Sequence, residues 1–153
     1  MQSGKQISAG WYVAADYLTA ALAWFCYYHW RSWILQDTGA YPISQISWTL
    51  ILLIVPAGWL MLYTLAGTYN HLYKKSRLAE FTLTFVCSLI GAIALFITFV
   101  FNDYDPKNGY TYFYYAFFTL LGIHFFLTFI GRWLILRKVK RQLLNGDVFF
   151  NTL

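Results

Sequence analysis

Long apolar stretches alternate with short polar ones along the chain. Four apolar segments, at about 11–35, 48–67, 81–101 and 112–136, each approach the roughly 20 residues that a helix needs to cross a bilayer. None of them alternates with a period of two, as a barrel strand would, and the bilayer core offers no water to exposed backbone groups. The pattern therefore predicts an all-α membrane protein with four transmembrane helices.

Basic residues are divided unequally between the polar stretches. Of the 11 lysines and arginines, only Arg31 and Lys107 fall on one side of the predicted spans. The positive-inside rule then places both termini and the 67–81 connection in the cytoplasm. Because the connections are short, we expect neighbouring helices to form an up-down antiparallel bundle with both ends inside.

Composition agrees with a membrane location. Hydrophobic residues make up 59% of the chain and charged residues 11%, whereas a soluble domain carries about 25% charge. The net charge of +5 is concentrated beside the apolar segments, which favours anionic lipid over nucleic acid as a partner. The candidate inner-leaflet lipid contacts are Lys74, Lys75, Arg77, Arg137, Lys138, Lys140 and Arg141.

A few polar residues lie inside the predicted spans. Asp16 and Arg132 occupy similar depths near the cytoplasmic side, so they are a candidate structural pair. The alternative is a role for them in binding a lipid phosphate or in moving protons. His124 lies near the middle of the fourth segment, either as a hydrogen-bonded residue between helices or as part of a proton relay. At the start of the third segment, Ser76 is a candidate helix cap and Glu80 a favourable charge in the first turn.

No set of catalytic residues emerges from the chain. There is no phosphate-cradling glycine motif, no nucleophile with a matching base, and no carboxylate pair expected on the cytoplasmic side. In the predicted topology His29 and His71 fall on opposite sides of the membrane, so the histidines do not share a metal site. We therefore expect no catalytic residue, cofactor or metal in this chain.

The order of four short sequences resembles a known family. These are "DYLTAALAWF" at 16–25, "GTYNHLYKKSRLAEF" at 67–81, "HFFLTFIGRWLI" at 124–135 and "GDVFFNTL" at 146–153. Together they resemble the amino-terminal membrane region of bacterial polyprenyl glycosylphosphotransferases, the sugar transferases that start exopolysaccharide and capsule synthesis. The resemblance covers nearly the whole chain and implies a multi-pass protein of the bacterial cytoplasmic membrane.

The resemblance also implies how the chain is divided. Residues 1–145 would be the transmembrane domain, and 146–153 the first strand of a cytoplasmic Rossmann-like domain. In the family, a further domain with a carboxylate pair and magnesium transfers a sugar phosphate from a nucleotide sugar to undecaprenyl phosphate. This chain would then anchor that enzyme beside the polyprenyl phosphate, and the bundle would be a surface for self-association.

Two other functions remain open at this point. One is a small transporter or flippase subunit, for which Pro56 and His124 are the relevant residues inside the spans. The other is a stand-alone membrane assembly or sensor protein that uses the aromatic bundle as its interaction surface.

Overall fold

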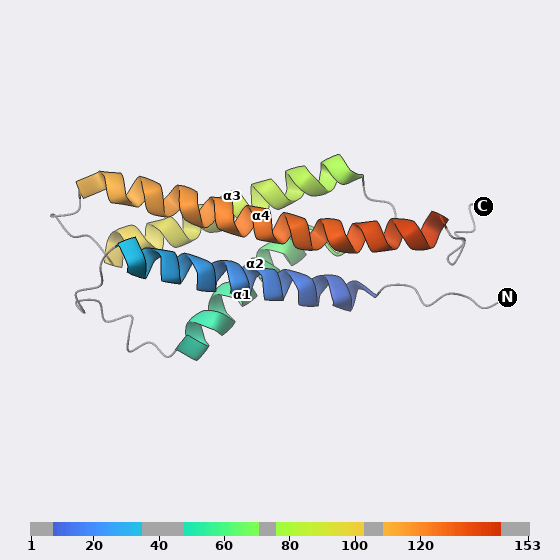
Figure 1. The fold of residues 1–153 in the computed structure, drawn as a ribbon, viewed down its shortest axis with the longest axis horizontal. Helices are drawn as coiled ribbons and strands as arrows, with labels where there is room; N and C mark the ends of the chain where they lie inside the picture. The colour runs from blue at the N-terminus through green and yellow to red at the C-terminus, as the bar shows by residue number, and fades with distance from the viewer. Residues whose placement is uncertain (1–7, 35–47, 71–75, 103–108, 145–153) are drawn as a thin grey trace.

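Four helices make up the part of the chain that the structure describes, residues 8–34, 48–70, 76–102 and 109–144. In this computed structural model they are α1 (Ala9–Ile34), α2 (Trp48–Leu65), α3 (Arg77–Asn102) and α4 (Gly109–Leu144), with no strand among the described residues (Figure 1). The all-helical prediction is confirmed. The segment at 146–153, expected to begin a further domain, lies outside the described residues.

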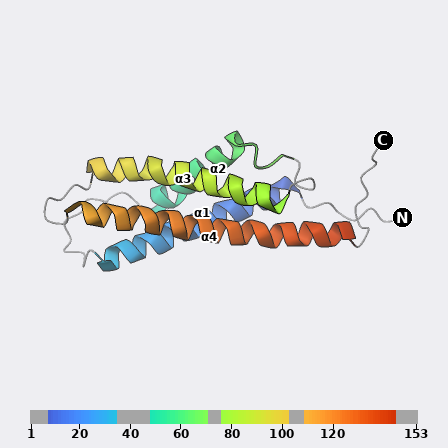
Figure 2. The ribbon, with the colours of Figure 1, turned by 90° about the horizontal axis from the view of Figure 1, so that it is seen from above.

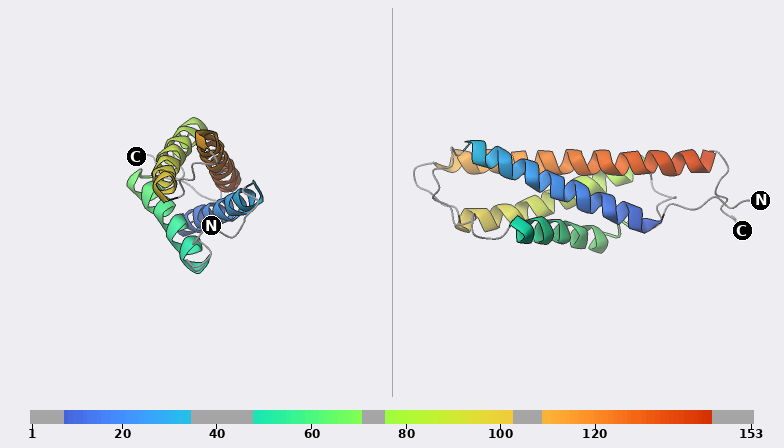
Figure 3. Two further views of the ribbon diagram at one scale, coloured as in Figure 1. Left: turned by 90° about the vertical axis from the view of Figure 1, so that its left-hand side faces the viewer. Right: turned by 60° about the horizontal axis from the view of Figure 1, so that its bottom comes forward.

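The helices lie side by side along the long axis of the molecule, and successive helices run in opposite directions (Figures 1 and 2). α1 packs most extensively on α4 and then on α2, α3 packs on α4, and the contact between α2 and α3 is smaller. Seen end-on, the four tilted helices surround a common centre, with α1 between α2 and α4 and with α3 opposite α1 (Figure 3). The start of α1 and the end of α4 therefore lie at the same end of the bundle, which we call the basic end because α4 finishes there in basic residues.

Hydrogen-bonded caps define the end of α2 and the start of α3. α2 ends in a Schellman motif: Thr68 N–H donates to the Tyr63 carbonyl at 2.9 Å and Gly67 N–H to the Thr64 carbonyl at 3.0 Å. Gly67 has a φ of +67°, a conformation that favours glycine. At the start of α3, the Ser76 hydroxyl accepts a hydrogen bond from the Ala79 N–H at 3.1 Å, which confirms the predicted cap.

Two glycines allow close contact between helices. A β-carbon at Gly91 on α3 would come within 2.1 Å of the Trp59 ring on α2, and one at Gly131 on α4 within 2.8 Å of the Thr19 Cγ2 on α1. Only hydrogen fits at these positions without a shift of the neighbour. Each glycine therefore sets the separation of one helix pair.

The outer surface carries large apolar side chains. Leu18 on α1, Met61 on α2, Ile97 on α3 and Phe126 on α4 are all half or more exposed, which is expected where a lipid bilayer rather than water surrounds a bundle. By length and composition, Arg77–Thr98 and Phe113–Gln142 are apolar enough to cross a membrane, and Leu52–Leu65 is a shorter apolar helix. These two segments support a membrane protein.

Candidate functional site

Polar side chains on α3 and α4 recur every four residues. Glu80, Thr84 and Ser88 on α3, and His124, Thr128 and Arg132 on α4, are all at most 1% exposed. Residues four apart lie on the same face of a helix, so each set forms one buried polar stripe. Asp16 on α1 is also 1% exposed, and Thr68, just after α2, is fully buried.

Arg132 is the centre of this buried cluster. Its Nε donates to Asp16 Oδ1 at 2.9 Å and its Nη2 to Asp16 Oδ2 at 2.7 Å, a two-bond ion pair between α4 and α1. Paired N–H groups and carboxylate oxygens in this arrangement give strong, directional bonds. The structure thus brings together the two residues proposed as a pair from their depth in the sequence.

A second carboxylate, from α3, joins the same guanidinium. Arg132 Nη1 donates to Glu80 Oε1 at 3.1 Å and to the Thr84 hydroxyl at 2.8 Å. The Thr84 hydroxyl in turn donates to the Glu80 backbone carbonyl at 2.7 Å, and the Tyr12 hydroxyl of α1 donates to Glu80 Oε1. Asp16 and Glu80 thus share Arg132, an arrangement that the sequence analysis did not predict.

The chain leaving α2 completes the cluster. The Tyr69 hydroxyl donates to Asp16 Oδ2 at 3.0 Å, and the Tyr69 ring meets the Tyr12 ring edge-on at 6.0 Å between centroids. Burial, and after it the negative charge of Asp16, raise the pKa of Tyr69 above its ordinary value. The hydroxyl therefore stays protonated, and remains a donor to the carboxylate, to a higher pH than an exposed tyrosine would.

Aromatic rings extend the cluster toward the middle of the bundle. The Arg132 guanidinium lies 4.0 Å from the centre of the Tyr63 ring, close enough for a cation–π contact. The Tyr63 hydroxyl is 2.9 Å from His124 Nε2, and the imidazole stacks on the Trp59 ring at 3.6 Å. His124 is thus a hydrogen-bonded residue between α4 and α2, the first of the two interpretations drawn from the sequence.

The geometry of the cluster favours a structural role. Four hydrogen bonds from Arg132 go to three side chains, and its own side chain is fully buried. A guanidinium held in this way has little capacity left for a lipid phosphate. Removing one member of a buried ion pair leaves an uncompensated charge in a medium of low polarity, so the cluster ties α1, α3, α4 and the end of α2 into one unit.

The other predicted site residues are on the surface. Arg77, Arg137, Lys138, Lys140 and Arg141 are exposed, and the Arg137 guanidinium lies 4.5 Å from the centre of the Trp133 ring. Lys74, Lys75 and His71 lie outside the described residues. Within the described ranges, no three His, Cys, Asp or Glu side chains come close enough together to hold a metal ion.

Sequence reasoning identified Asp16 and Arg132 but missed the rest of the cluster. Tyr12 and Tyr69 lie near helix ends, where aromatic residues are common in any membrane protein. The signal that could have revealed it is the four-residue spacing of Glu80 and Thr84 on α3, because the buried polar residues that lead up to Arg132 on α4 have the same spacing.

Comparison with models of protein families, with curated proteins and with solved structures finds no match to this chain.

Proposed function

We propose that this chain is the four-helix membrane anchor of a polyprenyl glycosylphosphotransferase. In this proposal all four helices cross the bacterial cytoplasmic membrane, with the basic end of the bundle in the cytoplasm. The enzyme moves a sugar phosphate from a nucleotide sugar to undecaprenyl phosphate, and this chain holds its cytoplasmic part beside the inner leaflet. The chemistry and its magnesium belong to that part.

The observation that carries the proposal is the position of the buried charge cluster. Asp16, Glu80 and Arg132 connect three helices at the basic end, and Tyr69 adds the exit of α2. A domain that follows α4 would be joined to this cluster through the continuous helix α4. An anchor needs this property, because a fixed distance between the catalytic groups and the membrane surface keeps the lipid-borne substrate within reach.

Two further observations support an anchor over a transporter. Transport sites commonly combine interrupted helices with polar groups near the bilayer midplane. Here α2 continues through Pro56 without interruption, and the His124 side chain is already bonded to Tyr63 and stacked on Trp59.

Membrane topology tests the first half of the proposal. Single cysteines placed at positions 5 and 107 in a background lacking Cys26 and Cys87 are labelled in intact cells with a membrane-impermeant maleimide. The proposal expects labelling at 107 in intact cells, and at 5 only after the membrane is opened. Labelling of position 5 in intact cells would contradict it.

The reading frame and the activity of the native gene product test the second half. The proposal expects codons after Leu153 to continue into a cytoplasmic domain, and membranes with the full-length product to transfer labelled sugar phosphate to undecaprenyl phosphate. In that full-length protein Arg132→Met should lower activity, while Arg137→Met, its matched surface control, should retain it. A native gene ending at codon 153 would refute the proposal.

A further inference from the structure

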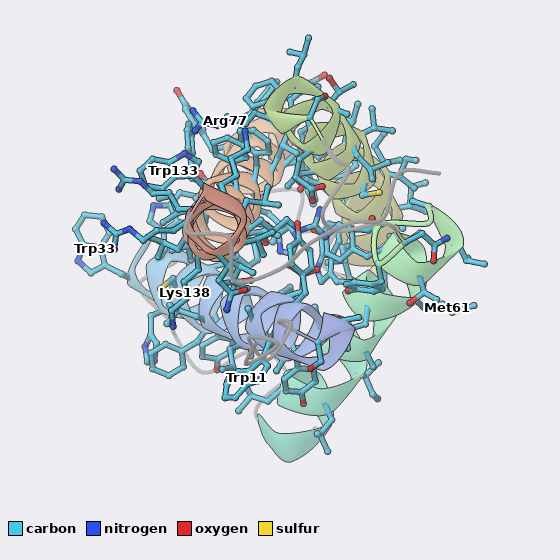
Figure 4. All side chains as sticks on the ribbon, turned by 90° about the vertical axis from the view of Figure 1, so that its right-hand side faces the viewer. Trp11, Trp33, Met61, Arg77, Trp133 and Lys138 are labelled. Carbon is cyan, nitrogen blue, oxygen red and sulfur yellow. The ribbon has the colours of Figure 1, made fainter. Side chains whose placement is uncertain are left out.

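A shallow groove runs between the first turns of α1 and the last turns of α4. Its volume is about 490 Å³, and it is open along one side. Figure 4 looks onto the basic end and shows Lys138 at the junction of α4 with α1, and Trp11 on the outer side of α1. The α1/α4 groove is lined by Trp11, Ala14 and Leu18 from α1, and by Ile135, Lys138 and Gln142 from α4.

The floor of the groove is apolar over most of its length. Trp11 and Leu18 both line the groove, and their side chains are 72% and 66% exposed, so they present apolar surface to whatever occupies it. The two residues are seven positions apart on one helix, so at about 1.5 Å per residue the apolar wall extends for roughly 10 Å. This length suits the upper methylene groups of an acyl chain.

The part of the groove at the basic end is positively charged and polar. Lys138 also borders an adjoining hollow of about 470 Å³ that Arg137 and Arg141 line. Gln142 lies on the same wall as Lys138, and its side-chain Nε2 can donate a hydrogen bond to a phosphate oxygen. An ammonium group and an amide beside an apolar channel match a phosphate joined to a hydrocarbon chain.

The described helices carry no acidic side chain that is available to pair with the basic residues at the end of α4. Their two acidic residues, Asp16 and Glu80, are buried and held by Arg132. The basic side chains at the end of α4 are exposed. This leaves a positive surface next to an apolar channel, which favours an anionic ligand.

We propose that the α1/α4 groove binds one anionic phospholipid, with its phosphate at Lys138 and Gln142 and an acyl chain along Trp11 and Leu18. The proposal rests on the proposed function only in requiring the bundle to lie in a membrane. It goes further than general attraction of basic residues to the inner leaflet, because it assigns a stoichiometry of one lipid and a defined site.

Native mass spectrometry of the detergent-purified protein tests the site. The probes are phosphatidylglycerol and phosphatidylcholine with identical acyl chains. We expect one phosphatidylglycerol to be retained in preference to phosphatidylcholine. Lys138→Gln should weaken its binding about fivefold, which corresponds to about 1 kcal/mol for one basic residue near a lipid surface. Lys140→Gln, with the same charge change on a residue that does not line the groove, should change binding less than twofold.

A second variant pair tests the apolar channel without altering charge. Ala14→Phe places a ring on the floor of the groove and should lower retention of phosphatidylglycerol, whereas Leu22→Phe, further along α1 and outside the groove, should not. Soluble glycerol phosphate should fail to displace the lipid, because it has no acyl chain.

Equal losses for Lys138→Gln and Lys140→Gln, or displacement by glycerol phosphate, would overturn the proposal. These results are distinguishable from failure of the proposed function. Lipid retention is measured without catalytic activity, and the labelling and reading-frame experiments make no use of Lys138.

Discussion

Removing the guanidinium of Arg132 is the most direct test of the buried cluster. Arg132→Met fills much of the same volume but removes four hydrogen bonds, leaving Asp16 and Glu80 at 1% exposure without their cation. Breaking a buried ion pair by deleting one partner costs about 3–5 kcal/mol. For a chain of this size the loss corresponds to a fall in melting temperature of about 6–20 °C.

The assay heats the native protein and each variant in mild detergent. Thermal unfolding is measured as the loss of the monodisperse peak in size-exclusion chromatography. The matched control is Arg137→Met, which removes an exposed guanidinium whose contact with the Trp133 ring is worth about 0.5–1 kcal/mol.

A combined variant separates the cost of stranded charge from the cost of lost bonds. In Asp16→Asn/Glu80→Gln/Arg132→Met no charge remains in the cluster, so we expect at least half of the lost stability to return. If Arg132→Met were no less stable than Arg137→Met, or if the combined variant were no more stable than Arg132→Met, the ion pairs of Arg132 would not be what stabilises the cluster.

Three further predictions concern individual contacts. Asp16→Asn should lower the free energy of unfolding by about 3 kcal/mol and Glu80→Gln by about 1–2 kcal/mol, because Asp16 forms two bonds to the guanidinium and Glu80 forms one. Chemical unfolding of both variants in detergent measures these losses, and a larger loss for Glu80→Gln than for Asp16→Asn would contradict the prediction. Tyr69→Phe should cost about 1–2 kcal/mol by removing the donor to Asp16. Since the pKa of Tyr69 is raised, its hydroxyl stays neutral in the folded protein while it ionises in the unfolded chain near pH 10. Stability should therefore fall as pH rises past that value, and melting curves from pH 8 to 11 should show a smaller fall for the Phe variant. Gly91→Ala should destabilise the bundle by about 1–3 kcal/mol, because its new methyl group would clash with the indole of Trp59 on α2. The control Gly122→Ala has open space around its β-carbon and should be neutral or slightly stabilising. Equal melting temperatures for the two variants would contradict the close packing of α2 on α3.

Much of the fold could be predicted because membrane helices are specified by composition. The length of each apolar run fixes the number of helices, and depth alone paired Asp16 with Arg132. A capping serine before a charged first turn located the start of α3. These signals are local, so one sequence is sufficient to read them.

The role of Glu80 could not be predicted in the same way. It lies in the first turn of α3, where an acidic residue already has a local explanation in the helix dipole. Its burial depends on how α3 is rotated against α4, and that rotation is set by contacts such as Arg132 with Thr84. Likewise, the contact of His124 with Tyr63 depends on the packing of α2, which no single segment encodes.

The order of the cluster residues along the chain has a consequence for biosynthesis. In the proposed topology, Asp16 and Glu80 are made and reach the membrane before Arg132, which arrives with α4. Until then the first and third helices carry carboxylates without their cation, each costly to bury in lipid. Arrival of α4 would neutralise this charge, so packing of the four helices would be coupled to the synthesis of α4. A nascent chain that stalls before Arg132 would be left as an unstable intermediate, open to recognition by membrane proteases.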